Sequence, residues 1–374
     1  MTSRERVTAA LTFEPPDRLP VNDSLWDGLQ AEWVGEGMPA GVSPVDHFGW
    51  DIESLSLDAS ARFEMKILAR GEGRLTFEDR AGYTVEKADG RSGTLHFLAH
   101  QTQSREDWEN RTKPRMVLDD PSGTARIDTA SYFCHFEPYP TWAEAKRKYD
   151  AVYSRGRFVN FVAYGPWEGT WRHRGLDRLL LDVLDEPEWC ADMFATYTRL
   201  LVATLERGLS LGLKPDGLFL VEDMAFKTSL LISPRTWDAL LRPCYEQLGT
   251  LLRRQGIRFL MHTDGRVWDL LPRLLEVGVE ALNPMECTAG MDLAELRRRY
   301  PRRMACYGNL SVAGLLGERA ALEAELQRKI PLGVGGGLIL HSDHSIPFGV
   351  RYEQYRWACA RAREIFAQAS VQGG

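Results

Sequence analysis

The sequence predicts an α/β protein, a (β/α)8 TIM barrel with an antiparallel β insertion in its N-terminal half. From residue 158 onward, short apolar runs that end in polar or Gly residues alternate with helical stretches, as repeated βα units do. A further strand near the N-terminus brings the count to about seven, close to the eight of a closed barrel. Between residues 51 and 103 the pattern changes to alternation with Gly-containing turns, which predicts antiparallel strands.

The N-terminal part opens with a helix and a short strand. Residues 3–11 are helix-like and stop before Pro15 and Pro16, because proline does not continue a helix. Residues 18–23 then form a short apolar run that ends in polar side chains. Residues 104–148 are rich in loops and helices, and we expect them to form a lid that carries His135 toward the pocket.

The second half supplies the repeated units. Ser233 followed by Pro234 marks the start of one connecting helix, because Ser is favoured as N-cap and Pro in the first turn. Asp292 with Glu295 marks another. The predicted strands of this half cover residues 158–164, 217–222, 259–262, 281–284, 304–307 and 337–341.

A doubly wound open sheet is the structural alternative. It is less favoured because no GxGxxG motif follows the first strand. We therefore expect residues 1–374 to form a single barrel, with residues 51–103 as a β-rich insertion within it.

Composition limits the function classes. Hydrophobic residues make up 44% of the chain and charged residues 26%, and no apolar run approaches the roughly 20 residues of a membrane-spanning helix. The net charge of −6 argues against nucleic acid or an anionic membrane as partner. Six widely spaced cysteines form no CxxC pair and follow no secretory leader, so we expect a cytoplasmic protein without a disulfide framework.

Polar residues at the ends of the predicted strands mark the candidate site, because these ends converge on the mouth of a barrel. The candidates are Asp23, Tyr164, Glu222, Asp223, His262, Asp264, Glu286, Asn309, His341, Asp343 and His344. As chain neighbours at a strand end, Glu222 and Asp223 point to opposite sides, so at most one of them faces the pocket. That residue would act as a general acid or orient the substrate.

Four of these residues fit a divalent metal site. His262 and Asp264 follow one strand, Glu286 follows the next, and His344 follows the last predicted strand. Two imidazoles and two carboxylates suit Zn²⁺, with Fe²⁺ or Mn²⁺ as other options. The competing interpretation is that each histidine is a structural or substrate-binding residue.

The chain resembles the uroporphyrinogen decarboxylase and cobalamin-linked methyltransferase superfamily, a group of (β/α)8 barrels, over nearly its whole length. The segments that carry this resemblance are residues 4–11 (RERVTAAL), 16–21 (PDRLPV), 164–168 (YGPWE), 176–187, 232–234 (ISP), 262–265 (HTDG), 282–284 (LNP), 289–296 (AGMDLAEL), 307–309 (YGN) and 336–347 (GGLILHSDHSIP). These motifs are specific for the superfamily and much less specific for the reaction.

The resemblance leaves two enzyme classes open. Porphyrinogen decarboxylases carry an Arg-Gln-Ala-Gly-Arg-Tyr segment whose arginines hold the substrate carboxylates, whereas residues 21–26 of this chain read VNDSLW. The missing cations disfavour that reaction. His344 nevertheless matches the late histidine of the decarboxylases, so a metal-free lyase acting on a carboxylated aromatic or pyrrole substrate stays the alternative.

Zinc methyltransferases of the superfamily use a His-x-Cys pair and a second Cys near the C-terminus. The resemblance places His262 on the His, Asp264 on the first Cys, Glu286 on an intervening Glu of related enzymes, and His344 on the last Cys. Replacing both thiolates leaves a harder ligand set, which makes a stronger Lewis acid. This favours an oxygen leaving group, as in the superfamily's components that demethylate aryl methyl ethers.

The implied function is therefore methyl transfer from a small aromatic methyl ether to the cobalt of a separate corrinoid protein. Residues 1–374 contain no Asp-x-His-x-x-Gly cobalamin motif, so the corrinoid would come in trans, on a partner that docks over the barrel mouth. A homodimer is a further option. The proposed substrate slot comprises Asp23, Trp26, Tyr132, Phe133, His135, Tyr164, Trp167 and Asn309. A non-enzymatic protein that keeps the ligand pocket is the third hypothesis.

Overall fold

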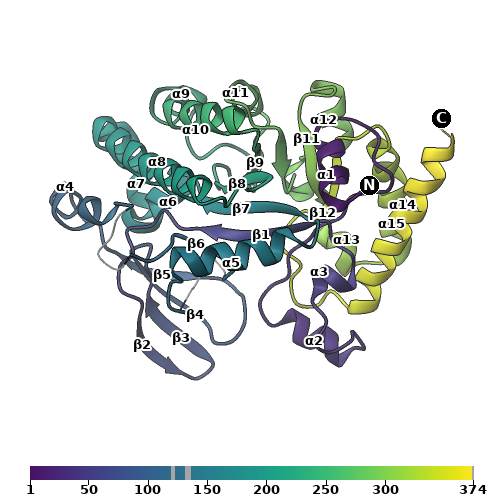
Figure 1. The fold of residues 1–374 in the computed structure, drawn as a ribbon, viewed down its shortest axis with the longest axis horizontal. Helices are drawn as coiled ribbons and strands as arrows, with labels where there is room; N and C mark the ends of the chain where they lie inside the picture. Colours follow the sequence, from purple (N-terminus) through teal and green to yellow (C-terminus); the bar gives the residue numbers. More distant parts are fainter. Residues whose placement is uncertain (119–122, 131–135, 373–374) are drawn as a thin grey trace.

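A computed structural model describes residues 1–118, 123–130 and 136–372. Its centre is an eight-stranded sheet in the order β12-β11-β10-β9-β8-β7-β1-β6 (Figure 1). The strands are β1 (Ile52–Leu57), β6 (Ile127–Asp128), β7 (Phe158–Tyr164), β8 (Gly217–Val221), β9 (Arg258–His262), β10 (Ala281–Asn283), β11 (Ala305–Leu310) and β12 (Leu338–Ser342). All neighbours from β1 to β12 pair in parallel, and β6 pairs antiparallel with β1. The predicted α/β class is confirmed.

Helices connect the parallel strands and lie around the sheet (Figure 1). They are α1 (Ser3–Leu11), α2 (Leu29–Gly35), α3 (Pro44–His47), α4 (Arg105–Asp107), α5 (Trp142–Tyr153), α6 (Pro166–Arg174), α7 (Leu176–Asp185), α8 (Pro187–Ser210), α9 (Pro234–Leu240), α10 (Arg242–Gln255), α11 (Leu271–Glu276), α12 (Leu293–Arg299), α13 (Val312–Leu316), α14 (Arg319–Lys329) and α15 (Tyr352–Gln372). Ser233 caps α9 and Asp292 caps α12 through side-chain hydrogen bonds, as the sequence predicts.

The predicted N-terminal strand over residues 18–23 is reduced to a single bridge. Val21 pairs in parallel with Leu340 of β12, and its carbonyl accepts a 2.7 Å hydrogen bond from the backbone N–H of Asp51, just before β1. This segment therefore lies between the two ends of the strand series. The segment contacts β12 through one bridge and the residue before β1 through one hydrogen bond, and a regular eighth parallel strand is not among the described residues.

The antiparallel insertion is present but shorter than residues 51–103, because β1 belongs to the main sheet. It consists of β2 (Lys66–Gly71), β3 (Arg74–Glu78), β4 (Tyr83–Ala88) and β5 (His96–His100), in that spatial order. Leu75, Phe77, Tyr83 and Val85 form a small core of its own. The alternation of β1 that resembles an antiparallel strand arises because Ser54 faces a cavity, as described below.

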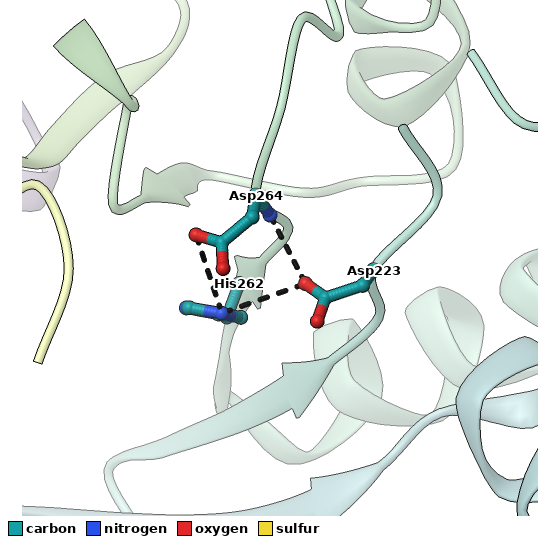
Figure 2. A group of neighbouring side chains, drawn as sticks. All are labelled: Asp223, His262 and Asp264. Carbon is teal, nitrogen blue, oxygen red and sulfur yellow. Dashed lines mark hydrogen bonds and ion pairs between the residues drawn. The ribbon is translucent and has the colours of Figure 1, made fainter. Parts of the chain in front are cut away.

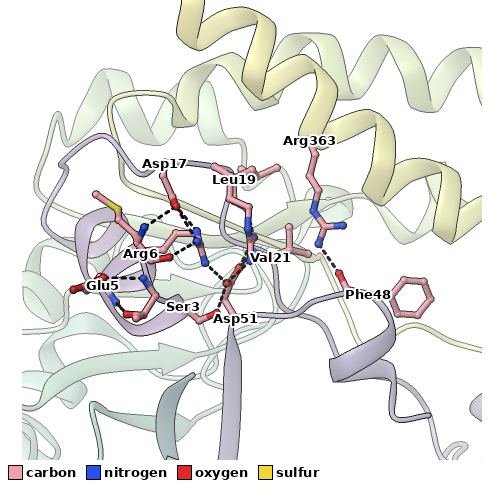
Figure 3. A network of polar contacts seen from close by, with 12 residues as sticks. Ser3, Glu5, Arg6, Asp17, Leu19, Val21, Phe48, Asp51 and Arg363 are labelled. Atoms are coloured by element: carbon pink, nitrogen blue, oxygen red, sulfur yellow. Dashed lines mark hydrogen bonds and ion pairs between the residues drawn. The ribbon is translucent and has the colours of Figure 1, made fainter. Parts of the chain in front are cut away.

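A buried carboxylate holds the start of β1 to the N-terminal segments (Figure 3). The side chain of Asp51 is fully buried and accepts hydrogen bonds from Arg6 at 2.8 Å and from Arg18 at 2.7 and 2.9 Å. It also accepts from the hydroxyl of Ser3 at 2.7 Å and from the backbone N–H of Val21 at 3.0 Å. Asp51 thereby ties α1 and residues 18–21 to the main sheet.

Two further expectations from the sequence concern membrane-spanning helices and disulfides. None of the helices in the described ranges combines the length and the apolar character needed to cross a membrane. The described cysteines, at positions 190, 244, 287, 306 and 359, are all free thiols.

Candidate active site

A cavity of about 400 Å³ opens at the carboxyl ends of the parallel strands. Its described lining consists of Asn22, Asp23, Ser24, Ser54, Asn160, Val162, Phe219, Val221, Asp223, His262, Asp264, Asn283, Pro284, Tyr307, His341, His344 and Ser345. Three of these residues are carboxylic acids and three are histidines, and this lining contains neither Lys nor Arg. The site is therefore suited to cationic or neutral ligands.

His262 ends β9 and is held in one orientation by Asn283. The amide nitrogen of Asn283 donates to the carbonyl of Tyr307 at 2.7 Å, so its Oδ1 atom, 2.6 Å from His262 Nδ1, accepts a hydrogen bond from the imidazole. In the neutral ring, this bond places the proton on Nδ1 and leaves the lone pair on Nε2. Nε2 lies 3.6 Å from Asp223 Oδ1 and 3.8 Å from Asp264 Oδ1.

Asp223 and Asp264 converge on that nitrogen from the loops after β8 and β9 (Figure 2). The backbone N–H of Asp264 donates to Asp223 Oδ1 at 3.1 Å, which holds the two loops together. The Oδ1 atom of Asp264 is buried, and it accepts no hydrogen bond from the residues that the structure describes. Burial raises the pKa of Asp264, although His262 opposes this shift. Burial alone would lower the pKa of His262, but Asp264 and Asp223 raise it.

The three side chains fit a divalent metal. One ligand atom from each of Asp223, His262 and Asp264 lies within 4.8 Å of the others. A hydrogen-bonded imidazole with a free Nε2 is the usual form of a histidine ligand. A cation between them would also compensate the buried Asp264 oxygen that lacks a partner. The chemistry of the donor set, two oxygens and one nitrogen, suits zinc and other divalent ions.

The structure changes the predicted ligand set. It brings His262 and Asp264 together and adds Asp223, which the sequence analysis assigns to acid catalysis or substrate orientation. His344 lies at the rim with its side chain 50% exposed, and its Nε2 is 3.8 Å from Asp264 Oδ2. Glu286 accepts hydrogen bonds from the backbone N–H of Gly265 at 2.9 Å and from the Thr288 hydroxyl. His344 and Glu286 are outside the three-residue cluster.

Glu222 points away from the cavity, as expected of one member of the Glu222–Asp223 pair. It is fully buried and accepts hydrogen bonds from the backbone N–H groups of Trp167 and Glu168 at 3.3 and 2.7 Å, and from the Tyr245 hydroxyl. Burial raises its pKa to about 8. Its contacts hold the start of α6 beside β8, and Glu222 is not in the described lining of the cavity.

The predicted substrate slot is only partly formed by the expected residues. Asp23 lines the cavity, and Trp26 packs its ring edge-on against His344 with 6.3 Å between centroids. Trp167 is buried outside the described lining of the cavity, and it donates its indole N–H to the carbonyl of Asp223 at 3.0 Å. Tyr164 is outside the cavity lining and packs against Arg172, whose Cζ lies 4.5 Å from the ring centroid.

Asn309 has a structural role. Its buried amide donates to the carbonyls of Met285 and Met291 at 2.6 and 2.7 Å and accepts from the N–H of Leu293 at 3.1 Å, which leaves it away from the cavity. His135, with Tyr132 and Phe133, lies outside the described residues.

Most of the described cavity residues carry no assigned role in the sequence analysis, among them Asn160, Phe219, Tyr307 and His341. Phe219 and Tyr307 occupy inward positions of predicted strands, where an aromatic residue indicates core packing as readily as a ligand contact. His341 stands at the end of a predicted strand, and this position is the sequence feature that indicates a place in the candidate site.

Replacing Asn283 by Ala should weaken metal binding. The variant loses the acceptor that fixes the His262 tautomer, and loss of such an outer partner typically costs about 10–100-fold in metal affinity. Competition with a fluorescent zinc chelator would measure this affinity. Asn283→Asp keeps an oxygen acceptor and should bind metal more tightly than Asn283→Ala. Equal affinities of both variants and the unmodified protein would contradict the assignment.

Comparisons with known proteins agree with this architecture. Residues 163–365 match the family model described as uroporphyrinogen decarboxylase (URO-D). A solved methyltransferase from Methanosarcina mazei is similar in fold, with a TM-score of 0.64 and 14% identity, over 98% of this chain and 99% of that one. A 3-keto-D-glucoside 4-epimerase from E. coli, YcjR, aligns with a TM-score of 0.36 and 14% identity, over 60% of this chain and 85% of that one, which is too weak to support an argument. No curated protein matches the sequence. Since the family model covers more than half of its residues, the chain belongs to the uroporphyrinogen decarboxylase family.

Proposed function

We propose that the chain is a metal-dependent methyltransferase that takes a methyl group from a small aromatic methyl ether and transfers it to the cobalt of a separate corrinoid protein. The observation that carries this proposal is the cluster of Asp223, His262 and Asp264 at the edge of the cavity. Two other findings support it. The chain belongs to the uroporphyrinogen decarboxylase family, and its fold resembles that of a solved methyltransferase over nearly the whole length of both chains.

Asp223, His262 and Asp264 would hold the metal, with Zn²⁺ as the proposed ion. When bound, it would supply Lewis acidity, which withdraws electron density from an ether oxygen. Asn283 orients His262 for this role, and the backbone N–H of Asp264 orients Asp223. Glu286 and His344 both influence the pKa of Asp264: the charge of Glu286 raises it, and His344 lowers it.

The protein's own residues bind and orient the ether. Phe219 and Tyr307 provide an aromatic surface next to His262, with 6.2 Å between the His262 and Phe219 ring centroids. In the transfer, the carbon–oxygen bond breaks and its electron pair stays on oxygen. The corrinoid of the proposed partner, as the substrate that accepts the methyl group, would provide the electron pair for the new bond. His344, half exposed at the rim, is placed to pass a proton from solvent to the departing oxygen.

The cavity composition favours this reaction over decarboxylation of a polyanionic substrate. Neither Lys nor Arg appears in the described lining, whereas anion-binding sites normally supply such cations.

A reconstituted assay tests the proposal. The purified chain should contain about one equivalent of a divalent metal, as a single Lewis-acid site requires. With 4-methoxyphenol and reduced Co(I) cobalamin as soluble acceptor, the absorbance should change as methylcobalamin forms. Removing the metal with a chelator should abolish this change, and adding Zn²⁺ should restore it. Unchanged turnover without metal, or CO₂ release from a carboxylated substrate without corrinoid, would overturn the proposal.

A further inference from the structure

The cavity has a second polar end, which lies away from the metal cluster. Asp23 is buried there and accepts hydrogen bonds from the hydroxyl of Tyr355 at 2.9 Å and from the hydroxyl of Ser342. His341 Nδ1 lies 3.7 Å from Asp23 Oδ1. In the strand order, β12 and the Val21 segment are separated from β9 by β10 and β11 on one side. On the other side β1, β7 and β8 intervene.

A row of rings joins the two ends. The ring centroids of His262 and Phe219 are 6.2 Å apart, those of Phe219 and Tyr307 are 5.6 Å apart, and those of Tyr307 and His341 are 5.2 Å apart. All four residues line the same cavity. An aromatic ligand that places one substituent at His262 can therefore lie along Phe219 and Tyr307 and direct its opposite substituent toward His341.

His341 presents an acceptor to such a substituent. Its Nδ1 lies 2.6 Å from the carbonyl oxygen of Ser342 and so donates to it, because a carbonyl can only accept. In the neutral ring, Nε2 then carries a lone pair and accepts a hydrogen bond. A hydroxyl group can donate to this atom, but a carboxylate has only acceptor atoms and cannot.

Asn160 and Ser54 add further hydrogen-bonding capacity from β7 and β1. The Asn160 side chain is buried, with 1% of the residue exposed, and its Oδ1 atom has no hydrogen-bond partner among the described residues. Ser54 is exposed to the cavity. A hydroxyl group, which both donates and accepts, matches this mixture of donors and acceptors.

The charges around this end disfavour an anion. Asp23 lies at this end, and neither Lys nor Arg appears in the described lining of the cavity. A ligand carboxylate placed here, away from the metal site, would lose its hydration without gaining a cationic partner, and an unpaired buried charge is unfavourable.

We propose that Asp23, His341, Ser54 and Asn160 select methyl ethers that carry an uncharged hydroxyl group, such as methoxyphenols, and reject the corresponding methoxybenzoates. This inference rests on the proposed function, because that function defines which end of the ligand faces the metal cluster. It adds the charge class of the substrate and the residues that recognise it.

Calorimetric titration of the zinc-loaded chain at pH 7.5 tests this selection without any corrinoid. The three ligands are 4-methoxyphenol, 4-methoxybenzoate and 4-methoxybenzamide, the last being an uncharged match in size to the benzoate. We expect the phenol and the benzamide to bind at least about tenfold more tightly than the benzoate, because burying the benzoate's unpaired carboxylate costs free energy that the two neutral ligands do not lose.

A charge substitution provides the matched variant. Ser54 faces open space in the cavity, so Ser54→Lys should fold and should raise benzoate affinity about tenfold or more, whereas the neutral Ser54→Gln should not.

Benzoate binding as tight as that of the phenol in the unmodified chain, or no binding by any ligand, would overturn the inference. Methyl transfer from methoxyphenol and methoxybenzoate at equal kcat/KM would overturn it and leave the proposed function intact. Selective binding of the phenol without any methyl transfer would instead remove the proposed function.

Discussion

Asp264→Asn should abolish metal binding and methyl transfer together. Asp264 contributes a buried oxygen that has no hydrogen-bond partner among the described residues and stands 3.8 Å from His262 Nε2. Removing its charge leaves Asp223 and His262 alone to hold a divalent ion. Because loss of an outer-shell partner already costs about 10–100-fold in affinity, loss of a direct ligand should lower kcat by more than about 100-fold. Elemental analysis and the methylcobalamin assay measure both effects.

The matched control is Asp269→Asn, which changes a carboxylate whose side chain is 65% exposed and pairs with Arg266 at 3.5 Å. It should retain full metal content and activity. Thermal unfolding of the metal-free proteins separates ligand loss from misfolding. Asp264→Asn should be at least as stable as the unmodified protein without metal, because it removes a poorly compensated buried charge. Full metal content and activity in Asp264→Asn would refute the assignment.

Asp51→Ala should be the most destabilising of the substitutions considered, although it lies far from the metal cluster in the strand order. The variant removes the shared acceptor of Arg6, Arg18, Ser3 and the Val21 backbone, shown in Figure 3. Arg6 is almost completely buried and would keep only its pair with Asp17, and Arg18 would lose its paired carboxylate. Breaking a buried ion pair in this way costs about 3–5 kcal/mol in the free energy of unfolding. Urea unfolding followed by circular dichroism would measure this loss.

Asp17→Ala is the control for that experiment, because Asp17 also binds Arg6, at 2.6 Å, but from a position where its side chain is 38% exposed. Exposed pairs contribute about 0–1 kcal/mol. A similar loss of stability in both variants would show that Asp51 has no special structural role. An unchanged urea midpoint in Asp51→Ala would show the same.

Most strands of the second half could be predicted from the sequence. The runs at residues 158–164, 217–222 and 259–262 coincide with β7, β8 and β9 to within a residue, because buried parallel strands are apolar on both faces and end abruptly in polar residues. The first strands were harder to assign. Val21 forms only one bridge, and β1 combines core-facing leucines with Ser54, which faces the hollow interior. That mixture has the same period as a half-exposed antiparallel strand.

The position of the candidate site could be predicted from the sequence, but the role of each residue in it was harder to predict. His262 and Asp264 were identifiable because charged residues directly after buried strands need compensation. The sequence does not show whether a strand-end side chain faces the cavity or a neighbouring helix. Trp167 and Asn309 therefore looked like ligand contacts, although both use their polar atoms to hold backbone carbonyls. The tautomer set by Asn283 depends on a distance between two strands and has no sequence pattern.

The two ends of the cavity differ in how soon they can form after synthesis. The contact between Asp223 and Asp264 spans 41 residues, all within consecutive βα units. The bond between Ser342 and Asp23 spans 319 residues and requires the N-terminal segment to meet the last strand. Closing a longer loop carries a larger entropic cost. The proposed metal ligands Asp223 and Asp264 can therefore come together on a nascent chain well before Asp23 meets Ser342. A divalent ion bound at that stage would stabilise the folded central units and act as a folding ligand as well as a catalyst.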